Sequence, residues 1–207
     1  IRDSSELIIN PDGSCFHLHL KPEQLADKII MVGDPDRVNT VASYFDTKEC
    51  EVSSREFHTI TGTYKGKRIT TLSHGIGTDN IDIVLNELDA LANIDFASRT
   101  IKPEFRQLTM VRVGTSGGLQ PFVPVGTYVA ARKSIGFDGV LYFYAGSEEV
   151  RDKAFESELI RQLEWKLNGI KPYVVSADPS LVEQITQNDI IRGVTTVSYT
   201  HLTLPTT

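Results

Sequence analysis

A strand-like segment that ends in a glycine-rich turn, residues 108–119, constrains the fold of this chain more than any other stretch. Residues 109–113 are β-branched or apolar except for Arg112, and the run stops at Gly114, so we predict a buried strand that opens into a turn. Arg112 falls at the carboxyl end of the strand, where α/β sheets bind ligands, and free amides and hydroxyls follow. The segment indicates a small oxyanion site. The alternative is an ion pair between Arg112 and a carboxylate beside an ordinary turn.

A second strand-to-helix corner lies near the start of the chain. Residues 28–32 form an apolar run that predicts a buried strand, Gly33 ends it, and Pro35 stands where a helix begins. Arg37 falls in the first turn of that helix, where its charge suits an anion held at the helix start. The alternative for Arg37 is a salt bridge to Asp34 or Asp36.

The middle of the chain predicts a hairpin followed by an amphipathic helix. Residues 59–64 and 68–73 alternate around a Lys-Gly-Lys turn, and residues 78–92 carry apolar side chains at helical spacing. Gly75 and Gly77 before this helix imitate two-thirds of a dinucleotide-binding fingerprint, but Asn80 replaces the third glycine, which disfavours a Rossmann cofactor site. The two glycines instead let the backbone pass close to a ligand or a packed neighbour.

Alternating strands and helices continue through the second half and predict the fold class. We expect one three-layer α/β domain over residues 1–207, with no linker or repeat dividing it. Its remaining predicted elements, in chain order, are an extended segment at 15–20 with both histidines on one face, strands at 125–131 and 139–145, a helix at 150–167 with Phe155, Leu159, Leu163 and Leu167 toward the core, a strand at 173–176, a helix at 179–187 and a strand at 190–195.

The composition limits the partners. A formal net charge of -6 argues against nucleic acid or an anionic membrane, so arginines gathered in such a chain indicate a small anionic ligand. Cys15 and Cys50 have no metal or redox spacing, and no apolar run approaches the roughly 18 residues of a membrane span. We therefore expect a cytoplasmic protein without a signal peptide, although the sequence starts at Ile1 rather than Met.

Four separated motifs stand out along the chain: Gly-Asp-Pro-Asp-Arg-Val at 33–38, Arg-Glu-Phe at 55–57, His-Gly-Ile-Gly at 74–77 and Arg-Val-Gly-Thr-Ser-Gly at 112–117. In this order and spacing they resemble the uridine phosphorylase branch of the nucleoside phosphorylase family, and Phe-His-Leu at 16–18 strengthens the match. The resemblance covers about residues 15–195 and implies a phosphorylase/hydrolase-like αβα fold with a central mixed β-sheet. Asp36 and Thr115 lean toward uridine, because purine-specific relatives tend to differ at these two positions.

The resemblance also implies roles for individual residues. Gly33, Arg37, Arg112 and Thr115 look like the phosphate site that a subunit contributes to its own active centre. Arg55 looks like an arginine lent by the adjacent subunit, and His17 like the residue that reaches the ribose across the same interface, which implies self-association into dimers and hexamers. Guanidinium groups bind phosphate oxygens in pairs and stay charged at any working pH, so three arginines suit a dianion.

The implied reaction is phosphorolysis of uridine to uracil and ribose 1-phosphate in nucleoside salvage. Phosphate is the nucleophile, so we assign no catalytic nucleophile, no metal and no cofactor beyond phosphate as co-substrate. In relatives a monovalent cation, such as potassium, can sit on a glutamate at the position of Glu56 and near Ile76. Asn80 stands here where a serine is usual.

The carboxyl-terminal part of the family pattern is missing from this sequence. Residues 197–207 resemble nothing expected in the family and look foreign, and the residues that would read the base are not present, so base-binding residues are unknown. We expect the truncated chain to be inactive by itself. The alternatives are a purine nucleoside phosphorylase, a nucleosidase of the same family, or a catalytically inactive anion-binding fragment; a hydrolase would not need the cluster of Arg37, Arg55 and Arg112.

Overall fold

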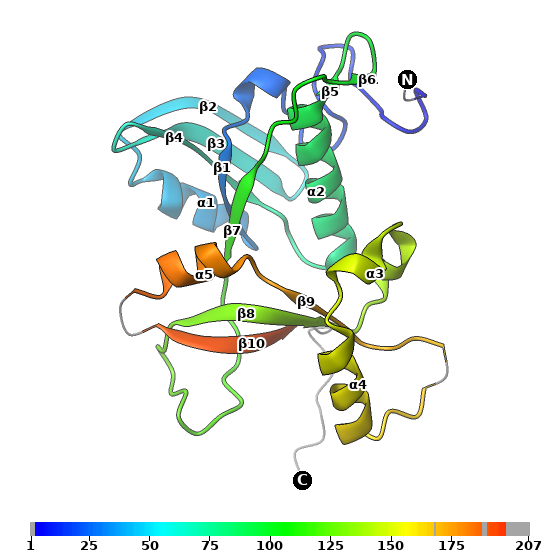
Figure 1. Ribbon diagram of the computed structural model, residues 1–207. Coiled ribbons are helices and arrows are strands. Elements are labelled where there is room, and N and C mark those ends of the chain that lie inside the picture. Colours follow the sequence, from blue (N-terminus) through cyan, green and yellow to red (C-terminus); the bar gives the residue numbers. More distant parts are fainter. Residues whose placement is uncertain (1–2, 168, 188–189, 198–207) are drawn as a thin grey trace. The chain divides into compact units, whose positions relative to one another are not determined.

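The computed structural model describes residues 3–167, 169–187 and 190–197 (Figure 1). These residues fall into two compact units, 1–116 and 117–207, each with its own sheet. The prediction of a single domain stays a prediction, and the suspected foreign tail after residue 197 lies outside the described residues. None of the described helices is both long enough and apolar enough to cross a bilayer.

Unit one contains most of the predicted elements at the predicted places. Its elements are a 3-10 helix η1 (Pro22–Gln24), strand β1 (Lys28–Val32), helix α1 (Pro35–Ala42), strands β2 (Thr47–Ser54), β3 (Phe57–Tyr64) and β4 (Lys67–Ser73), helix α2 (Thr78–Asn93), and strands β5 (Ile94–Asp95), β6 (Thr100–Ile101) and β7 (Thr109–Val113). The hairpin of β3 and β4 turns through Lys65 and Gly66 at φ of 48° and 72°, two successive left-handed residues that match the twist of the strands.

The five-stranded sheet of unit one is mixed and has the order β2-β3-β4-β1-β7. β1 runs parallel to both β4 and β7, whereas β2, β3 and β4 are joined as antiparallel neighbours. Val32 pairs with Ser73 on one side and with Val113 on the other. The three parallel strands therefore end at the same level of the sheet.

Helices α1 and α2 cover opposite faces of this sheet (Figure 1). Ile29 and Met31 of β1 join the larger apolar cluster with α2, whereas Val32 and the partly buried Ile30 join the smaller cluster with α1. Successive side chains of a strand point to opposite faces, so the apolar residues 29–32 of β1 supply both layers. The predicted three-layer α/β architecture with a mixed sheet is confirmed in this unit.

Two predictions in unit one are wrong. β7 was predicted to be buried, but it is an edge strand that pairs only with β1, and Val113 is 53% exposed. The segment at 15–20 is not extended: the backbone amide of Cys15 donates to the carbonyl of Leu20, and His19 adopts a φ of 54°. This turn separates the two histidines that alternation had placed on one face.

Unit two departs further from the sequence prediction. Its elements are β8 (Val129–Gly136), the 3-10 helix η2 (Val140–Phe143), α3 (Ser147–Val150), α4 (Lys153–Gln162), β9 (Tyr173–Ser176), α5 (Pro179–Ile185) and β10 (Ile191–Val197). The sheet order is β10-β8-β9. β9, α5 and β10 agree with prediction, whereas β8 begins four residues later than predicted, at Val129 rather than residue 125.

Glycines and one acidic residue explain the other differences in unit two. The predicted strand at 139–145 is η2, because Gly139 and Gly146 take left-handed φ values of 81° and 77° at its two ends. The predicted helix at 150–167 is α4, which starts where the Asp152 carboxylate accepts the amide of Phe155 and ends before Glu164 at a φ of 46°. Leu163 and Leu167, predicted to face the core, are therefore exposed, and Glu156 is the buried residue of α4.

Candidate functional site

The first group of predicted site residues lies where β1, β4 and β7 end together. Gly33, His74 and Gly114 are the residues that follow these strands, and the amide of His74 donates to the carbonyl of Val32 at 2.9 Å. A Cβ added to Gly33 would lie 3.9 Å from the carbonyl oxygen of Gly75 and from Cε1 of His74. The first, third and fourth motifs thus meet at one edge of the sheet, because β1, β4 and β7 run parallel and end at the same level.

The Arg112 guanidinium is held by a histidine and not by a carboxylate. Its Nε donates to Nε2 of His74 at 2.9 Å, and the side chain folds over the backbone of Gly114, where an added Cβ would lie 2.6 Å from Nη1. Among the described residues Arg112 makes no ion pair with a carboxylate. The described residues therefore do not form the salt bridge considered as the alternative for Arg112, and no ion pair among them neutralises its charge.

His74 is a neutral support for that arginine. The imidazole is buried, and burial together with the Arg112 charge lowers the pKa of His74. Because Nε2 accepts a hydrogen bond, the neutral ring carries its proton on Nδ1. In the sequence, His74 stands out only as part of a motif, and its position directly after a strand was the signal that could have identified it.

Arg37 is also without a carboxylate partner. It lies exposed in the first turn of α1, where the Asp34 carboxylate is occupied as the helix cap and accepts the amide of Asp36 at 2.9 Å. No hydrogen bond or ion pair of the Arg37 side chain occurs within residues 3–167, 169–187 and 190–197, so the alternative salt bridge to Asp34 or Asp36 is not formed. Thr115 follows β7 in an exposed segment, and the described residues offer its hydroxyl no hydrogen-bond partner.

The two residues predicted to serve a neighbouring subunit lie together. The Arg55 guanidinium carbon sits 5.8 Å from the centroid of the Phe16 ring, and the Phe16 and His17 rings meet edge to face at 4.8 Å. Arg55 itself occupies the turn between β2 and β3 at a φ of 55°. Phe16 thus joins His17 to Arg55, and sequence reasoning had used it only as part of a motif.

Glu56 and Ile76, the residues predicted to hold a monovalent cation, both accept hydrogen bonds from the side-chain amide of Asn80. Asn80 Nδ2 donates to Oε1 of Glu56 at 2.8 Å and to the carbonyl oxygen of Ile76 at 3.0 Å. Gly75 allows this approach, because an added Cβ would lie 2.8 Å from Cγ of Glu56. The described residues contain no group of three or more His, Cys, Asp or Glu side chains placed to hold a metal ion.

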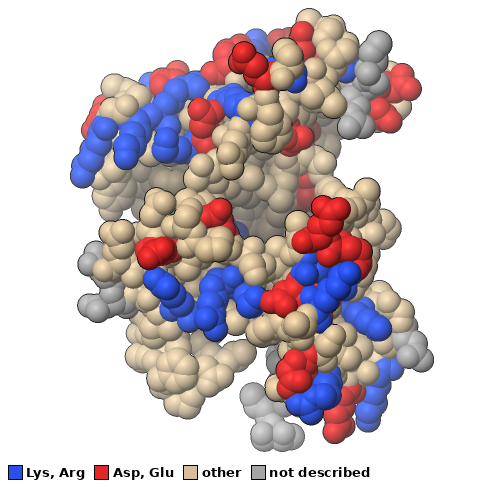
Figure 2. Space-filling view, viewed as in Figure 1, with Lys and Arg blue, Asp and Glu red and all other residues tan. Residues whose placement is uncertain are grey.

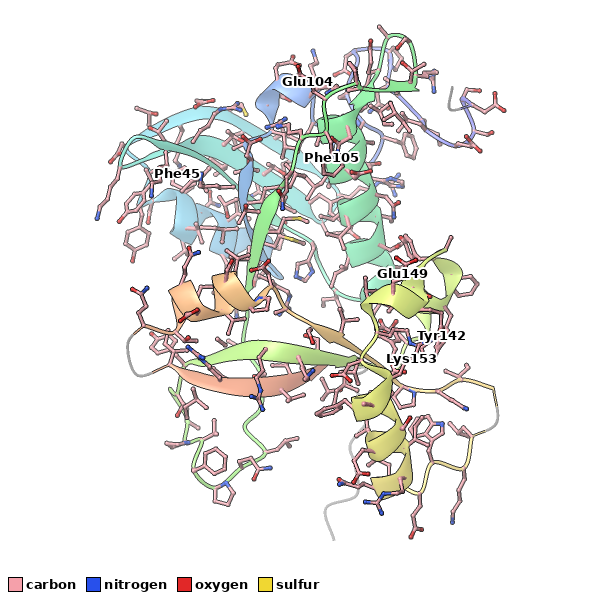
Figure 3. The ribbon with its side chains drawn as sticks, viewed as in Figure 1. Phe45, Glu104, Phe105, Tyr142, Glu149 and Lys153 are labelled. Carbon is pink, nitrogen blue, oxygen red and sulfur yellow. The ribbon has the colours of Figure 1, made fainter. Side chains whose placement is uncertain are left out.

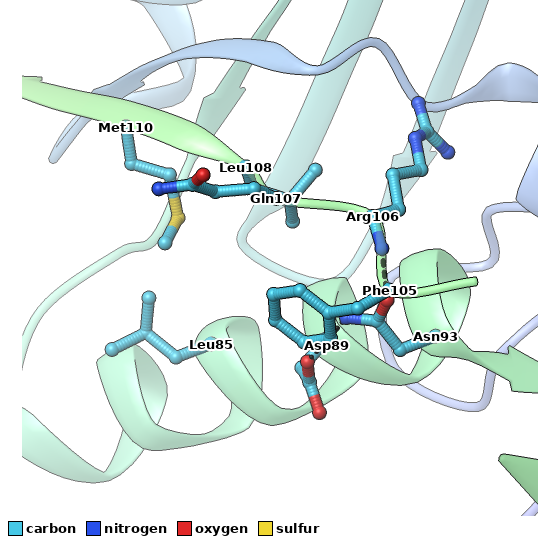
Figure 4. Close-up of a pocket in the computed structure, with 8 residues that line it drawn as sticks. All are labelled: Leu85, Asp89, Asn93, Phe105, Arg106, Gln107, Leu108 and Met110. Atoms are coloured by element: carbon cyan, nitrogen blue, oxygen red, sulfur yellow. Dashed lines mark hydrogen bonds between the residues drawn. The ribbon is translucent and has the colours of Figure 1, made fainter. Parts of the chain in front are cut away.

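The apolar groove between α2 and the segment that leads into β7 is a different feature (Figure 4). It has a volume of about 410 Å³. Among its polar lining residues, Asn93 donates to Asp89 at 2.8 Å and accepts the amide of Arg106 at 2.8 Å. The Arg106 guanidinium bonds to Asp27 and to the carbonyl of Leu25. No predicted phosphate or ribose residue lines this groove.

Basic side chains also gather elsewhere on unit one. Figure 2 shows them over the free end of the β3-β4 hairpin, where Lys65, Lys67 and Arg68 lie. Arg68 is already paired with Glu49 at 2.8 Å. This patch lies at the start of β4, opposite the edge where β4 ends beside His74, so it does not belong to the site.

Comparisons with known proteins identify relatives of this chain. The family model described as the phosphorylase superfamily matches residues 27–204. A uridine phosphorylase of Thermococcus kodakarensis is 30% identical over 145 residues, 70% of this chain and 47% of the relative. A DeoD-type purine nucleoside phosphorylase of Roseobacter denitrificans is 34% identical over 117 residues, 56% of this chain and 44% of the relative. The chain thus spans about half the length of these relatives.

A solved structure supports the same relationship. The crystal structure of a Trypanosoma brucei nucleoside phosphorylase, described as showing uridine phosphorylase activity, superposes with a TM-score of 0.76 at 32% identity, covering 92% of this chain and 67% of that one. The match extends over both halves of the chain, so the likeness does not depend on one motif. With the family model covering residues 27–204, the chain belongs to the phosphorylase superfamily.

Proposed function

We propose that the whole protein is a nucleoside phosphorylase that transfers ribose from uridine to inorganic phosphate, releasing uracil. The observation that carries this proposal is that Arg37 and Arg112 make no ion pair among the described residues, although both lie at strand-to-helix or strand-to-turn corners of one sheet edge. Cations held without counter-ions in a chain of net charge -6 suit an anionic substrate. The uridine phosphorylase relatives favour uridine.

The geometry suits a reaction in which the enzyme orients rather than attacks. Phosphate held by guanidinium groups and by the amides after Gly33 and Gly114 would attack the anomeric carbon, and its charge would stabilise the sugar as it becomes cation-like. The glycosidic bond breaks and uracil leaves with the bonding electrons. No side chain of the protein forms a covalent bond with the nucleoside, and phosphate is the only co-substrate.

Self-association completes the proposed site. His17 and Arg55 lie together through Phe16 and would serve the active centre of an adjacent subunit in a dimer, with hexamers built from such dimers. A potassium ion at Glu56 and Ile76 would have to displace the Asn80 amide from both oxygens. We place the protein in the cytoplasm, where the free thiols of Cys15 and Cys50 would stay reduced.

The test is phosphate dependence. Full-length protein is expected to release uracil from uridine only when phosphate is supplied, with ribose 1-phosphate as the second product. Equal release in phosphate-free buffer would identify a nucleosidase. Because one relative is a purine nucleoside phosphorylase, turnover of inosine should be measured as well. A preference for inosine over uridine would identify a purine nucleoside phosphorylase. If the protein binds phosphate but turns over neither nucleoside, the result would identify a catalytically inactive anion-binding protein.

A further inference from the structure

We propose that Glu87 is a positioning residue that holds His17 in the tautomer with its proton on Nδ1, so that Nε2 accepts a hydrogen bond from a substrate hydroxyl. This inference rests on the proposed function for the identity of the hydroxyl, which would belong to the ribose. The placement of the proton rests on the contacts of Glu87 alone.

The Glu87 carboxylate receives hydrogen bonds from three N–H groups of the segment that carries His17. Its Oε1 lies 2.7 Å from Nδ1 of His17 and 2.9 Å from the His17 amide nitrogen. Its Oε2 lies 2.8 Å from the amide nitrogen of Leu18. The Glu87 side chain is only 12% exposed and projects from α2, where the next residue, Leu88, is fully buried in the core. The rigid helix thus fixes the position of the acceptor.

These contacts determine where the imidazole carries its proton. An ionised carboxylate only accepts hydrogen bonds, so Nδ1 must be the donor, and the neutral ring then has its lone pair on Nε2. Within the described residues Nε2 of His17 has no hydrogen-bond partner, and the side chain is 29% exposed. The edge-to-face contact with Phe16 restrains the ring plane. Nε2 is therefore an oriented acceptor open to a ligand.

The Cys15 thiol beside Glu87 does not add a second charge there. Burial, followed by the negative charge of Glu87, raises the pKa of the Cys15 thiol, which keeps this neighbour neutral. A purely structural role would require only the backbone amides of His17 and Leu18. His58 shows the contrast: its Nε2 lies 3.0 Å from Glu51 and its Nδ1 lies 3.3 Å from the carbonyl of Pro35, so neither nitrogen is left for a ligand.

The tautomer can be read directly by long-range proton–nitrogen NMR of the 207-residue chain labelled at histidine, without substrate, at a pH above the usual range for imidazole titration. His17 is assigned from the signal lost in His17→Gln. We expect a pyrrole-type Nδ1 and a pyridine-type Nε2 in the wild type. Glu87→Gln leaves one acceptor oxygen for three donors, and Glu87→Leu leaves none, so we expect the ring to shift toward the Nε2–H form in both variants.

Glu104→Gln is the matched control, because Glu104 is exposed on the connection before β7 and makes no ion pair within the described chain (Figure 3). It removes the same charge and should leave His17 unchanged. In full-length protein we expect Glu87→Gln to raise the KM for uridine about tenfold with a smaller change in kcat, the size of one lost hydrogen bond. The same substitution should have no further effect in a His17→Gln background.

The NMR and kinetic results separate this inference from the proposed function. An Nε2–H ring in the wild type, or an Nδ1–H ring that survives in both Glu87 variants, would overturn the inference even if the protein phosphorolyses uridine. A tautomer shift in both variants would support the assignment of Glu87 even if the phosphate test identifies another activity. Additive effects of the Glu87 and His17 substitutions on KM would count against it.

Discussion

At the scale of single residues, the main finding is that the arginine at the end of β7 is supported by a neutral imidazole. Arg112 donates to His74, and both groups lie where three parallel strands end. A carboxylate in the place of His74 would cancel the arginine charge. The histidine orients the guanidinium through one hydrogen bond and leaves its positive charge for an anion.

Replacing Arg112 by Ala should therefore impair activity more than stability. We expect kcat/KM for uridine phosphorolysis by the full-length protein to fall by on the order of a hundredfold or more, since a charged donor to phosphate is lost. The midpoint of urea unfolding should change little, because the side chain is exposed. Arg68→Ala, at the opposite end of the sheet and paired with Glu49, is the control. If Arg112→Ala lowered the midpoint of urea unfolding but the folded fraction kept the wild-type kcat/KM, the result would contradict a role of Arg112 in phosphate binding.

Protonation of His74 should weaken unit one at low pH. Burial and the Arg112 charge lower the pKa of His74, so the unfolded chain binds the proton more readily than the folded one. This contribution to stability is present above about pH 6.5, the usual pKa of histidine, and is lost as the pH falls toward the lower folded value, with a slope approaching about 1.4 kcal/mol per pH unit.

Urea unfolding of the 207-residue chain at pH 5 and pH 7.5 measures this effect. His74→Gln should reduce the difference between the two free energies of unfolding, because the glutamine does not titrate. His19→Gln, an exposed histidine, should leave the difference as it is in the wild type. An identical pH dependence in all three proteins would show that His74 is protonated equally in the folded and unfolded chains.

At the scale of elements, β3 depends on one glycine that sequence reasoning did not select. The antiparallel register of β2 and β3 shifts between Lys48 and Cys50, and this brings the backbone of Thr47 against Gly62. A Cβ at Gly62 would lie 2.1 Å from the carbonyl oxygen of Thr47 and 2.8 Å from the Phe45 ring. Both contacts are closer than real Cβ atoms allow.

Gly62→Ala should accordingly destabilise unit one by about 2–4 kcal/mol, because the backbone of one strand must move. Gly117→Ala is the matched control, since nothing lies within 4 Å of the added Cβ and no positive φ is involved. Thermal and urea unfolding of the two variants measures the difference. Equal stabilities would mean that β2 can shift without cost.

At the scale of the whole molecule, the clustering of Arg55 with Phe16 and His17 makes the shared site testable. Mixing an Arg55→Ala chain with an Arg37→Ala chain of the full-length protein should restore part of the activity, because a hybrid interface would contain one site with both arginines. Each variant by itself should be nearly inactive. Mixed oligomers without recovered activity, with their formation checked by native mass spectrometry, would show that Arg55 serves its own subunit.

The sequence by itself determined the elements whose patterns are local. An uninterrupted apolar run predicted β1, alternation around a Lys-Gly-Lys turn predicted the β3-β4 hairpin, and helical spacing predicted α2, and each was confirmed. The motifs predicted the family and a ligand site at the carboxyl end of β7, whereas the position of His74 beside Gly33 and Gly114 comes from the strand pairing. In unit two the same reasoning predicted a strand where η2 forms, because left-handed Gly139 and Gly146 precede and follow the apolar run.

Only the tertiary structure decided which side chains are partners. Glu87 lies 70 residues from His17 in the chain, and Arg112 lies 38 residues from His74. The run of mostly apolar residues in β7 likewise did not indicate that this strand lies exposed at the edge of the sheet. Hydrophobic periodicity indicates which face of one segment packs against the core. A hydrogen bond between residues far apart in the chain depends instead on strand order and register, which long-range packing determines.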